Sequence, residues 1–329
     1  MQLGLDLPAV SLEALRPYVQ MTDAERSFRS FLDKFNVLRR FYQSPEIIER
    51  LAYEVVEDAA RENVRYLELR FTPAALGSAN RYAFEDVIAW VQAGVARARA
   101  DHPRLQVGLI ISLNRHEPVK VAERVTRLAV DLKDQGIVGL DLAGDEVNFP
   151  AEPFEHLFQA AGSAGLGLTA HAGEWTGAAA VRHAIERLGV QRVGHGVRVV
   201  EDPAAAALAR ERGTVFEVCL TSNLHSGVIG RMAEHPLPAM RAMGLRTTLN
   251  TDDPAVSDIT LSTEYALAVE ALGLGLAEVR QAILTAAGAA FLPPGERAAL
   301  VAQFERELAL SGVKDLATNY TNLAKGAGE

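Results

Sequence analysis

Apolar residues follow two different rhythms along the chain. Up to about residue 63 they recur at helical spacing, and the stretch SFRSFLDKFNVLRRFY places five of them near one face of a helix. The members of this face are Phe28, Phe31, Phe35, Leu38 and Phe41. Ser44, Pro45 and Glu46 then form a helix start, with a capping hydroxyl, a proline at the first helical position and an acid near the positive end of the dipole. We therefore predict that residues 1–63 are mainly helical and that the last of these helices runs to about Glu62.

From residue 64 the rhythm changes to short apolar runs that are rich in strand-forming residues and separated by helical stretches. Seven such runs lie at 64–73, 105–115, 136–146, 166–175, 191–196, 214–223 and 246–254. Apolar strands that alternate with helices are typical of a parallel sheet with both faces covered. A repeat of about 30 residues is that of a (β/α)8 barrel, whose ~250 residues divide into eight units. The pattern predicts an α/β fold of this TIM type, with seven strands recognisable and the first strand missing.

The organisation of the chain indicates one domain. No low-complexity segment and no linker interrupts residues 1–329, and the part after Pro254 returns to helical spacing. We expect a single barrel domain with a helical N-terminal part at 1–63, the barrel units at 64–254 and C-terminal helices at 255–329.

Polar side chains with catalytic potential gather where the predicted strands end. They are Arg115, His116, Asp145, Glu146, His171, Glu174, His195, Ser222, Asn223, Asp252 and Asp253. Barrel enzymes build their sites at this face of the sheet. Loops are polar in most proteins, which is the simpler explanation for any one strand. Six strand ends that carry His, Asp, Glu or Asn and no Lys favour a functional site.

The residue types at these ends suit metal-assisted hydrolysis. His171 offers a neutral nitrogen and Asp252 a carboxylate, a combination that binds zinc with a position left open for water. His195 lies between two glycines that let the backbone approach a ligand closely, and it can act as a ligand or accept a proton. Glu174, shielded from water, would hold a raised pKa and donate a proton. Taken singly, a histidine at a strand end is more often structural than a ligand, and an Asp-Asp-Pro sequence is often only a turn or a helix cap.

Composition narrows the classes of function. Of 329 residues, 23% are charged and the net charge is −9, without a basic patch, so we expect no nucleic-acid partner. The single cysteine, Cys219, excludes a disulfide framework and any multi-cysteine metal site, and it fits a reducing cytoplasm. No run reaches the ~20 apolar residues of a membrane span. We expect a cytoplasmic protein without a membrane partner.

Five motifs in chain order resemble the adenosine deaminase family of zinc-dependent barrel hydrolases. They are DLAGDE at 141–146, HAGEW at 171–175, RVGHG at 192–196, VCLTSN at 218–223 and NTDDP at 250–254. Each motif alone is a weak signal, but their order at consecutive strand ends is specific, and the resemblance covers roughly residues 5–300.

The resemblance implies a role for each matching metal or proton-handling residue. His171 and Asp252 would be ligands of one zinc ion. Glu174 would protonate the purine ring nitrogen next to the carbon under attack, and His195 would orient and deprotonate the water at the zinc. Asp252 would thereby belong to both the metal site and the catalytic set.

The resemblance also implies a purine nucleoside as the substrate. Asp253 would hydrogen-bond the imidazole side of the purine, and the backbone amide of Gly144 would bind another ring nitrogen. The implied reaction is the hydrolytic deamination of adenosine to inosine and ammonia.

One feature of the family is missing. Its first strand carries a His-x-His pair that supplies two further zinc ligands, whereas the first histidine here is His102. Three explanations stay open: a start codon upstream of Met1, a truncated chain, or a natural relative that has lost its metal site. We expect weak zinc binding, low or absent activity, and poor stability or association through exposed strand edges.

Two other functions stay open. A related aminopurine, such as adenine, aminofutalosine or an adenosine monophosphate analogue, is an alternative substrate. The helix with Phe28, Phe31 and Phe35 would then form one wall of the pocket, although most of these rings suit core packing. A non-catalytic purine-binding protein is the second alternative, which the retained Glu174 and His195 disfavour because binding alone needs no proton-handling pair.

Overall fold

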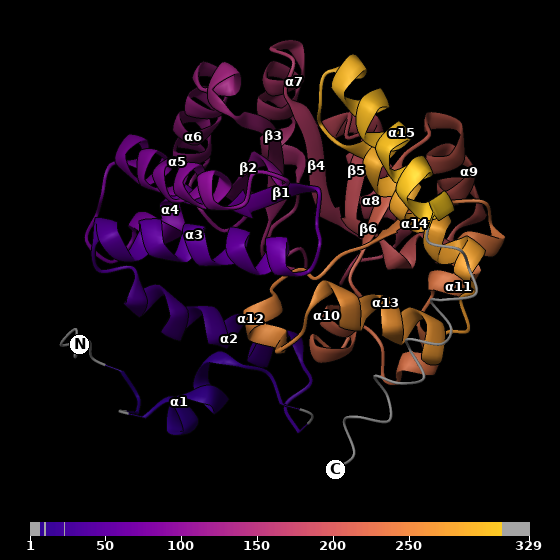
Figure 1. Ribbon diagram of the computed structural model, residues 1–329, viewed down its shortest axis with the longest axis horizontal. Helices are drawn as coiled ribbons and strands as arrows, with labels where there is room; N and C mark the ends of the chain where they lie inside the picture. The colour runs from indigo at the N-terminus through magenta and orange to yellow at the C-terminus, as the bar shows by residue number, and fades with distance from the viewer. Residues whose placement is uncertain (1–6, 10, 23, 311–329) are drawn as a thin grey trace.

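The fold is built on one curled sheet of seven parallel strands (Figure 1). The structure is a computed structural model and describes residues 7–9, 11–22 and 24–310. The strands pair in chain order, and every neighbouring pair is parallel. They are β1 (Tyr66–Phe71), β2 (Gln106–Asn114), β3 (Ile137–Ala143), β4 (Gly167–Ala172), β5 (Arg192–His195), β6 (Val215–Val218) and β7 (Arg246–Leu249).

Helices connect the strands and cover the outside of the sheet. The helices α1 and α2 lie below the sheet in the view of Figure 1, near α12. The α-helices are α1 (Leu12–Val19), α2 (Phe28–Leu38), α3 (Pro45–Arg61), α4 (Pro73–Gly77), α5 (Phe84–Asp101), α6 (Val119–Asp131), α7 (Glu155–Ser163), α8 (Ala178–His183), α9 (Pro203–Arg212), α10 (Leu220–His225), α11 (Leu237–Ala242), α12 (Pro254–Ser257), α13 (Leu261–Glu270), α14 (Leu276–Ala289) and α15 (Pro294–Leu310). Short single-turn helices are η1 (Arg39–Phe41), η2 (Lys133–Gln135), η3 (Glu152–Phe154), η4 (Ala184–Leu188), η5 (Val197–Glu201) and η6 (Met232–Glu234).

The predicted seven strands are confirmed, and each begins within two residues of the expected start. Most predicted runs extend a few residues past the end of the observed strand. The largest change of structure is in the run 214–223, where β6 stops at Val218 and a helix begins at Leu220. The carboxylate of Glu264 causes this change, because it accepts the backbone N–H groups of Leu220 and Thr221 at the start of α10. Ser222 and Asn223 are therefore held by a helix.

The N-terminal segment is helical as predicted, wherever it is described. The hydroxyls of Ser11, Ser27 and Ser44 accept the N–H groups that begin α1, α2 and α3. Pro45 takes the first position of α3, which ends at Arg61. The parts of the helical prediction that fall on residues 1–6 and 311–329 lie outside the described residues.

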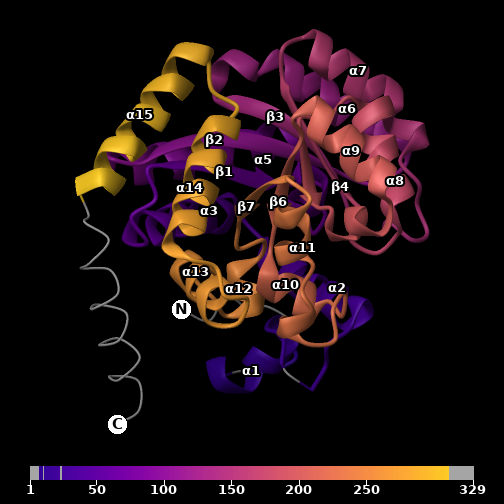
Figure 2. The same cartoon turned by 90° about the vertical axis from the view of Figure 1, so that its right-hand side faces the viewer.

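The sheet is open on one side. In the described part of the chain β1 and β7 each pair with one neighbour, and α14 lies against β7 beside the opening (Figure 2). A cavity of about 2310 Å³ reaches from the carboxyl ends of the strands into this opening, where Tyr66, Ala287 and Leu300 line it. Over the described residues the fold is thus a TIM-type barrel sheet that lacks one strand. The expected instability of its edges stays a prediction.

The described helices contain no candidate membrane span, since none is long and apolar enough to cross a bilayer.

Candidate active site

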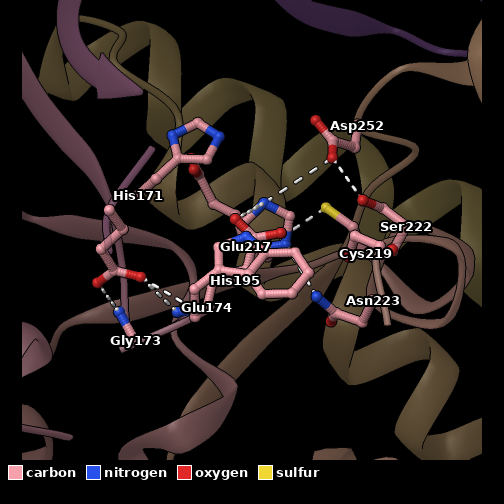
Figure 3. Close-up of polar contacts among 12 residues, drawn as sticks. His171, Gly173, Glu174, His195, Glu217, Cys219, Ser222, Asn223 and Asp252 are labelled. Carbon is pink, nitrogen blue, oxygen red and sulfur yellow. Dashed lines mark hydrogen bonds and ion pairs between the residues drawn. The ribbon is translucent and has the colours of Figure 1, made fainter. Parts of the chain in front are cut away.

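Three side chains that can bind a metal converge at the carboxyl end of the sheet. His171 is the penultimate residue of β4, His195 ends β5, and Asp252 lies just beyond β7. Their candidate ligand atoms all lie within 4.8 Å of one another. Figure 3 shows the three side chains turned toward one another. The structure therefore brings together the two residues that the sequence analysis paired as zinc ligands, with His195 beside them.

The backbone is unusual at two of these residues. His195 has a φ of 57° and Asp252 a φ of 56°, both in the left-handed region that residues with a Cβ atom disfavour. We expected the glycines beside His195 to admit a ligand. Instead, a Cβ atom on Gly194 would lie 3.3 Å from the ring and backbone of His171. This glycine lets β5 pack closely against β4 and so sets the spacing of the two imidazoles, whose ring centroids are 5.2 Å apart.

Charged side chains from β3 and β1 contact His171. The Oδ1 atom of Asp141, on β3, lies 3.2 Å from Nδ1 of His171, and the guanidinium of Arg70, on β1, is 3.5 Å from the same nitrogen. This arrangement leaves Nε2 as the nitrogen that can bind a metal. Burial lowers the pKa of His171, but the Asp141 carboxylate outweighs it and raises the pKa to about 9. A metal must therefore displace a proton from this ring.

Asp252 is held by a hydroxyl from α10. Ser222 Oγ donates a hydrogen bond of 2.7 Å to Oδ2 of Asp252. Burial raises the pKa of this carboxyl, but His195 and His171 outweigh that effect and the pKa is lowered, so that Asp252 is ionised. The adjacent Asp253 behaves in the opposite way, because burial and the charge of Asp252 raise its pKa well above the usual range. The pair thus combines an ionised carboxylate with a neighbouring carboxyl whose raised pKa favours the protonated, hydrogen-bond-donating form.

Glu174 and His195 form a proton-handling pair. The Nε2 atom of His195 lies 3.7 Å from Oε2 of Glu174 and 3.8 Å from Oδ2 of Asp252. Burial raises the pKa of Glu174, and the nearby histidines oppose this only in part. Glu174 is therefore suited to carry a proton into the site.

A second carboxylate organises the loop that carries Glu174. The side chain of Glu146, which is 6% exposed, accepts backbone N–H groups from four consecutive residues, 173 to 176, at 2.6 to 3.2 Å. Arg115 supports the same region, since its Nη2 donates to the backbone oxygen of His171 at 2.6 Å. Both residues were predicted to lie at a strand end that faces the site. The structure uses them to fix backbone, and neither lines the cavity.

The remaining predicted residues divide in the same way. Gly144, with a φ of 96°, and His116 line the cavity. The carboxylate of Asp145 also borders it but accepts the N–H groups of Val147 and Asn148, which is the geometry of a local turn.

Aromatic rings from α2 form one wall of the cavity. Phe28, Phe31 and Phe35 all line it, and the ring of Phe28 lies 4.5 Å from that of Trp175, in the loop after β4. Phe31 also belongs to a small apolar cluster with Val256 of α12. Phe31 thus has both of the expected roles, since it lines the cavity and also packs in an apolar cluster.

Four residues that shape the site escaped the sequence analysis. Asp141, Arg70 and Glu217 lie inside apolar strands, and His235 follows η6. Charged residues in the middle of apolar strands are costly to bury unless they are paired, so LELRF, GLDLA and VFEV each contained a signal of an internal ionic network. For His235 the sequence offers no comparable signal.

An open barrel sheet with imidazoles and carboxylates gathered at its carboxyl end defines the class of barrel enzymes that use a metal centre. The model of the adenosine deaminase family matches residues 1–306, and the chain belongs to that family.

Relatives support this membership over almost the whole chain. The chain is 40% identical over 302 residues to an adenosine deaminase from Klebsiella pneumoniae, which covers 91% of this chain and 90% of that protein. The solved structure of an adenine deaminase from Arthrobacter aurescens superposes with a TM-score of 0.81 at 27% identity, and covers 93% of this chain and 91% of that one. Arabidopsis ADAL complexed with IMP gives a TM-score of 0.80 at 27% identity, with 90% and 87% covered.

Proposed function

We propose that this protein is a hydrolase of cyclic amidine C–N bonds that converts adenosine and water into inosine and ammonia. The observation that carries the proposal is the convergence of His171, His195 and Asp252 within 4.8 Å, with Glu174 3.7 Å from His195. Membership of the adenosine deaminase family and the identity to the Klebsiella pneumoniae adenosine deaminase support it.

The donor set fits one zinc ion. His171 and Asp252 would hold it, because an imidazole nitrogen and a carboxylate oxygen are ligands that zinc prefers. Asp141 and Ser222 hydrogen-bond these two residues from behind, as the outer partners of metal ligands do. A bound zinc ion would supply a nucleophile at neutral pH by lowering the pKa of a water molecule to about 7.

The proton steps belong to the side chains. Burial raises the pKa of Glu174, which favours its protonated form. Glu174 would donate to the ring nitrogen next to the amino-bearing carbon, which makes that carbon electrophilic. His195 lies between Glu174 and Asp252 and would orient the attacking water. Ammonia then leaves with the proton that the water loses.

Two groups would bind the purine. The carboxyl of Asp253, whose raised pKa favours the protonated form, would donate a hydrogen bond to a nitrogen on the imidazole side of the base. The backbone N–H of Gly144 would bind another ring nitrogen. Both residues line the cavity, and the ring of Phe28 would cover the opposite side.

A related aminopurine is the second candidate substrate. The similarity to the Arthrobacter aurescens adenine deaminase and to the N6-methyl-AMP deaminase from Arabidopsis thaliana supports it, the latter with a TM-score of 0.77 at 28% identity over 86% of this chain. A cavity of about 2310 Å³ accommodates a base, a nucleoside or a nucleotide.

Ammonia release by the purified chain, supplied with zinc, tests the proposal. Adenosine is compared with adenine, aminofutalosine and adenosine monophosphate at equal concentration, and Glu174→Gln is the inactive reference. We expect the highest kcat/KM for adenosine. Faster ammonia release from another aminopurine would identify that compound as the substrate in place of adenosine. Purine binding without ammonia release from any of the compounds would contradict the enzymatic function.

A further inference from the structure

A line of three buried hydrogen bonds leads away from His195 to the start of α11. The Nδ1 atom of His195 lies 3.2 Å from Nδ2 of Asn223, and Oδ1 of Asn223 lies 3.1 Å from Nε2 of His235. The Nδ1 atom of His235 in turn accepts the backbone N–H of Leu237 at 3.0 Å. The three side chains are no more than 4% exposed, so water does not compete for these bonds.

The backbone N–H of Leu237 determines which atoms donate and which accept along these hydrogen bonds. A backbone N–H can only donate, so Nδ1 of His235 is an acceptor and carries no hydrogen. Burial lowers the pKa of His235 to about 4, which keeps the ring neutral at neutral pH. A neutral imidazole carries one hydrogen, and here it must be on Nε2. His235 therefore donates to the Oδ1 atom of Asn223.

The side-chain amide of Asn223 in turn determines which nitrogen of His195 accepts a hydrogen bond. Because the oxygen of Asn223 faces His235, its NH2 group faces His195 and donates to Nδ1. Nδ1 of His195 is then an acceptor and carries no hydrogen, so that the one hydrogen of this ring is on Nε2. Nε2 is the atom that faces Glu174 and Asp252.

We infer that His235 is a positioning residue that, through Asn223, fixes the ring hydrogen of His195 on Nε2, so that His195 donates a hydrogen bond to the attacking water instead of accepting its proton. This inference rests on the proposed function and changes the role of one residue in it.

The proton that the water loses consequently needs another acceptor. Glu174 becomes a carboxylate when it has protonated the purine ring, and its Oε2 atom is 3.7 Å from Nε2 of His195. Glu174 then accepts the proton of the water and passes it to the departing ammonia. The protons balance, because Glu174 gives one to the ring and takes one from the water in each cycle.

The tautomer of His195 can be measured directly, without an activity assay. The full chain with 15N-labelled histidine is placed in long-range 1H–15N spectra at neutral pH, and His195→Gln and His235→Gln assign the two rings. We expect both rings to carry hydrogen on Nε2 and none on Nδ1. Hydrogen on Nδ1 of His195 would overturn the inference.

Asn223→Asp replaces the NH2 donor that faces Nδ1 of His195 with an accepting oxygen, and the side chain keeps almost the same shape. A carboxylate only accepts, so His195 must place its hydrogen on Nδ1. We expect the spectrum of His195 to switch and kcat to fall by about 100-fold or more, with KM nearly unchanged, because a positioned proton donor contributes roughly 10²–10⁴-fold. Asn80→Asp is the matched control, since the side chain of Asn80 bonds Gln43 and Tyr82 away from the site. An Asn223→Asp enzyme with full kcat would overturn the inference.

A pair of His235 variants separates positioning from packing. His235→Leu fills space but cannot donate to Asn223, whereas the amide of His235→Gln can. We expect kcat to fall in the first and largely to recover in the second, and equal losses would contradict the inference. A chain that keeps the tautomer but releases no ammonia contradicts the proposed function alone. A chain that releases ammonia with hydrogen on Nδ1 of His195 contradicts this inference alone.

Discussion

Glu146 controls the position of Glu174 through the backbone. Its carboxylate lies under the turn after β4 and accepts the N–H of Glu174 at 3.1 Å, together with those of the residues on either side. The arrangement resembles an anion held in a nest of consecutive amides, with a side chain in place of the anion. The side chain of Glu174 contributes no hydrogen bond to this turn, and it stays free for chemistry.

Glu146→Gln should therefore damage both stability and activity. The amide replaces one accepting oxygen with a donor that faces N–H groups, so about 2–3 kcal/mol of the free energy of unfolding is lost, as for a hydrogen bond to a charged group. kcat should fall because Glu174 is no longer held in place. Urea denaturation and steady-state kinetics measure the two effects. Glu152→Gln, at a carboxylate whose side chain is 62% exposed, is the control and should change neither. Unaltered kcat in Glu146→Gln would show that the turn does not position Glu174.

Glu174→Gln should remove the proton donor and keep the binding site. We expect kcat to fall by about 100-fold or more, because general acid catalysis contributes roughly 10²–10⁴-fold. The affinity for an unreactive purine nucleoside, measured by calorimetry, should change little. Glu186→Gln, in an exposed ion pair with Arg182, serves as the control. If Glu174→Gln turned over adenosine at the original rate, another group would be the acid.

Ser222→Ala should weaken metal binding without removing a ligand. The hydroxyl donates to Asp252 at 2.7 Å, and loss of such an outer partner typically lowers metal affinity by about 10–100-fold. Titration of zinc against a chromogenic chelator measures the affinity, with Ser78→Ala as a surface control whose hydroxyl bonds only its own helix. His171→Ala should bind weaker still. Equal affinity in Ser222→Ala and the original chain would place the metal elsewhere.

Glu217→Gln should change how stability depends on pH. Burial raises the pKa of Glu217, but Arg70 and Arg192 outweigh it and lower the pKa to about 2. A carboxyl with a pKa lower in the folded than in the unfolded chain stabilises the fold above about pH 4.3, and this contribution is lost as the pH falls toward 2.

The original chain should thus lose stability over this acidic interval, and Glu217→Gln should lose less there. At pH 7 the variant should be less stable by about 3–5 kcal/mol, because one partner of a buried ion pair is removed. Denaturation series between pH 7 and pH 3 test both statements, with the exposed pair of Arg124 and Glu85 as the control through Glu85→Gln. Parallel pH profiles for Glu217→Gln and the original chain would contradict the argument.

The sequence predicted the sheet well because each strand is a local pattern. Apolar runs of fixed spacing predicted all seven strands, and polar residues at their ends predicted the face of the site. The prediction was wrong at Leu220, where a helix begins. The cause is Glu264, a residue distant in the chain whose carboxylate caps that helix. A local pattern carries no information about such a partner.

The same limit applies to the site. The proximity of His171 and Asp252 could be predicted because their motifs coincide with strand ends. The contacts of Asp141 with His171 and of His235 with Asn223 were not found, because they depend on which strands and turns become neighbours. The buried charges of Arg70 and Glu217 were visible as interruptions in apolar strands, but their pairing was not.

The left-handed backbone conformation at His195 and Asp252 lowers the stability of the fold at two residues that the proposed reaction needs. A residue with a Cβ atom in that conformation costs on the order of 1–3 kcal/mol, a cost that glycine does not incur. The backbone cost alone therefore favours glycine at both positions, and such a change would discard an imidazole and a carboxylate of the proposed reaction centre. A screen that scores folding without scoring turnover would enrich inert proteins, and only a combined selection would retain the working enzyme.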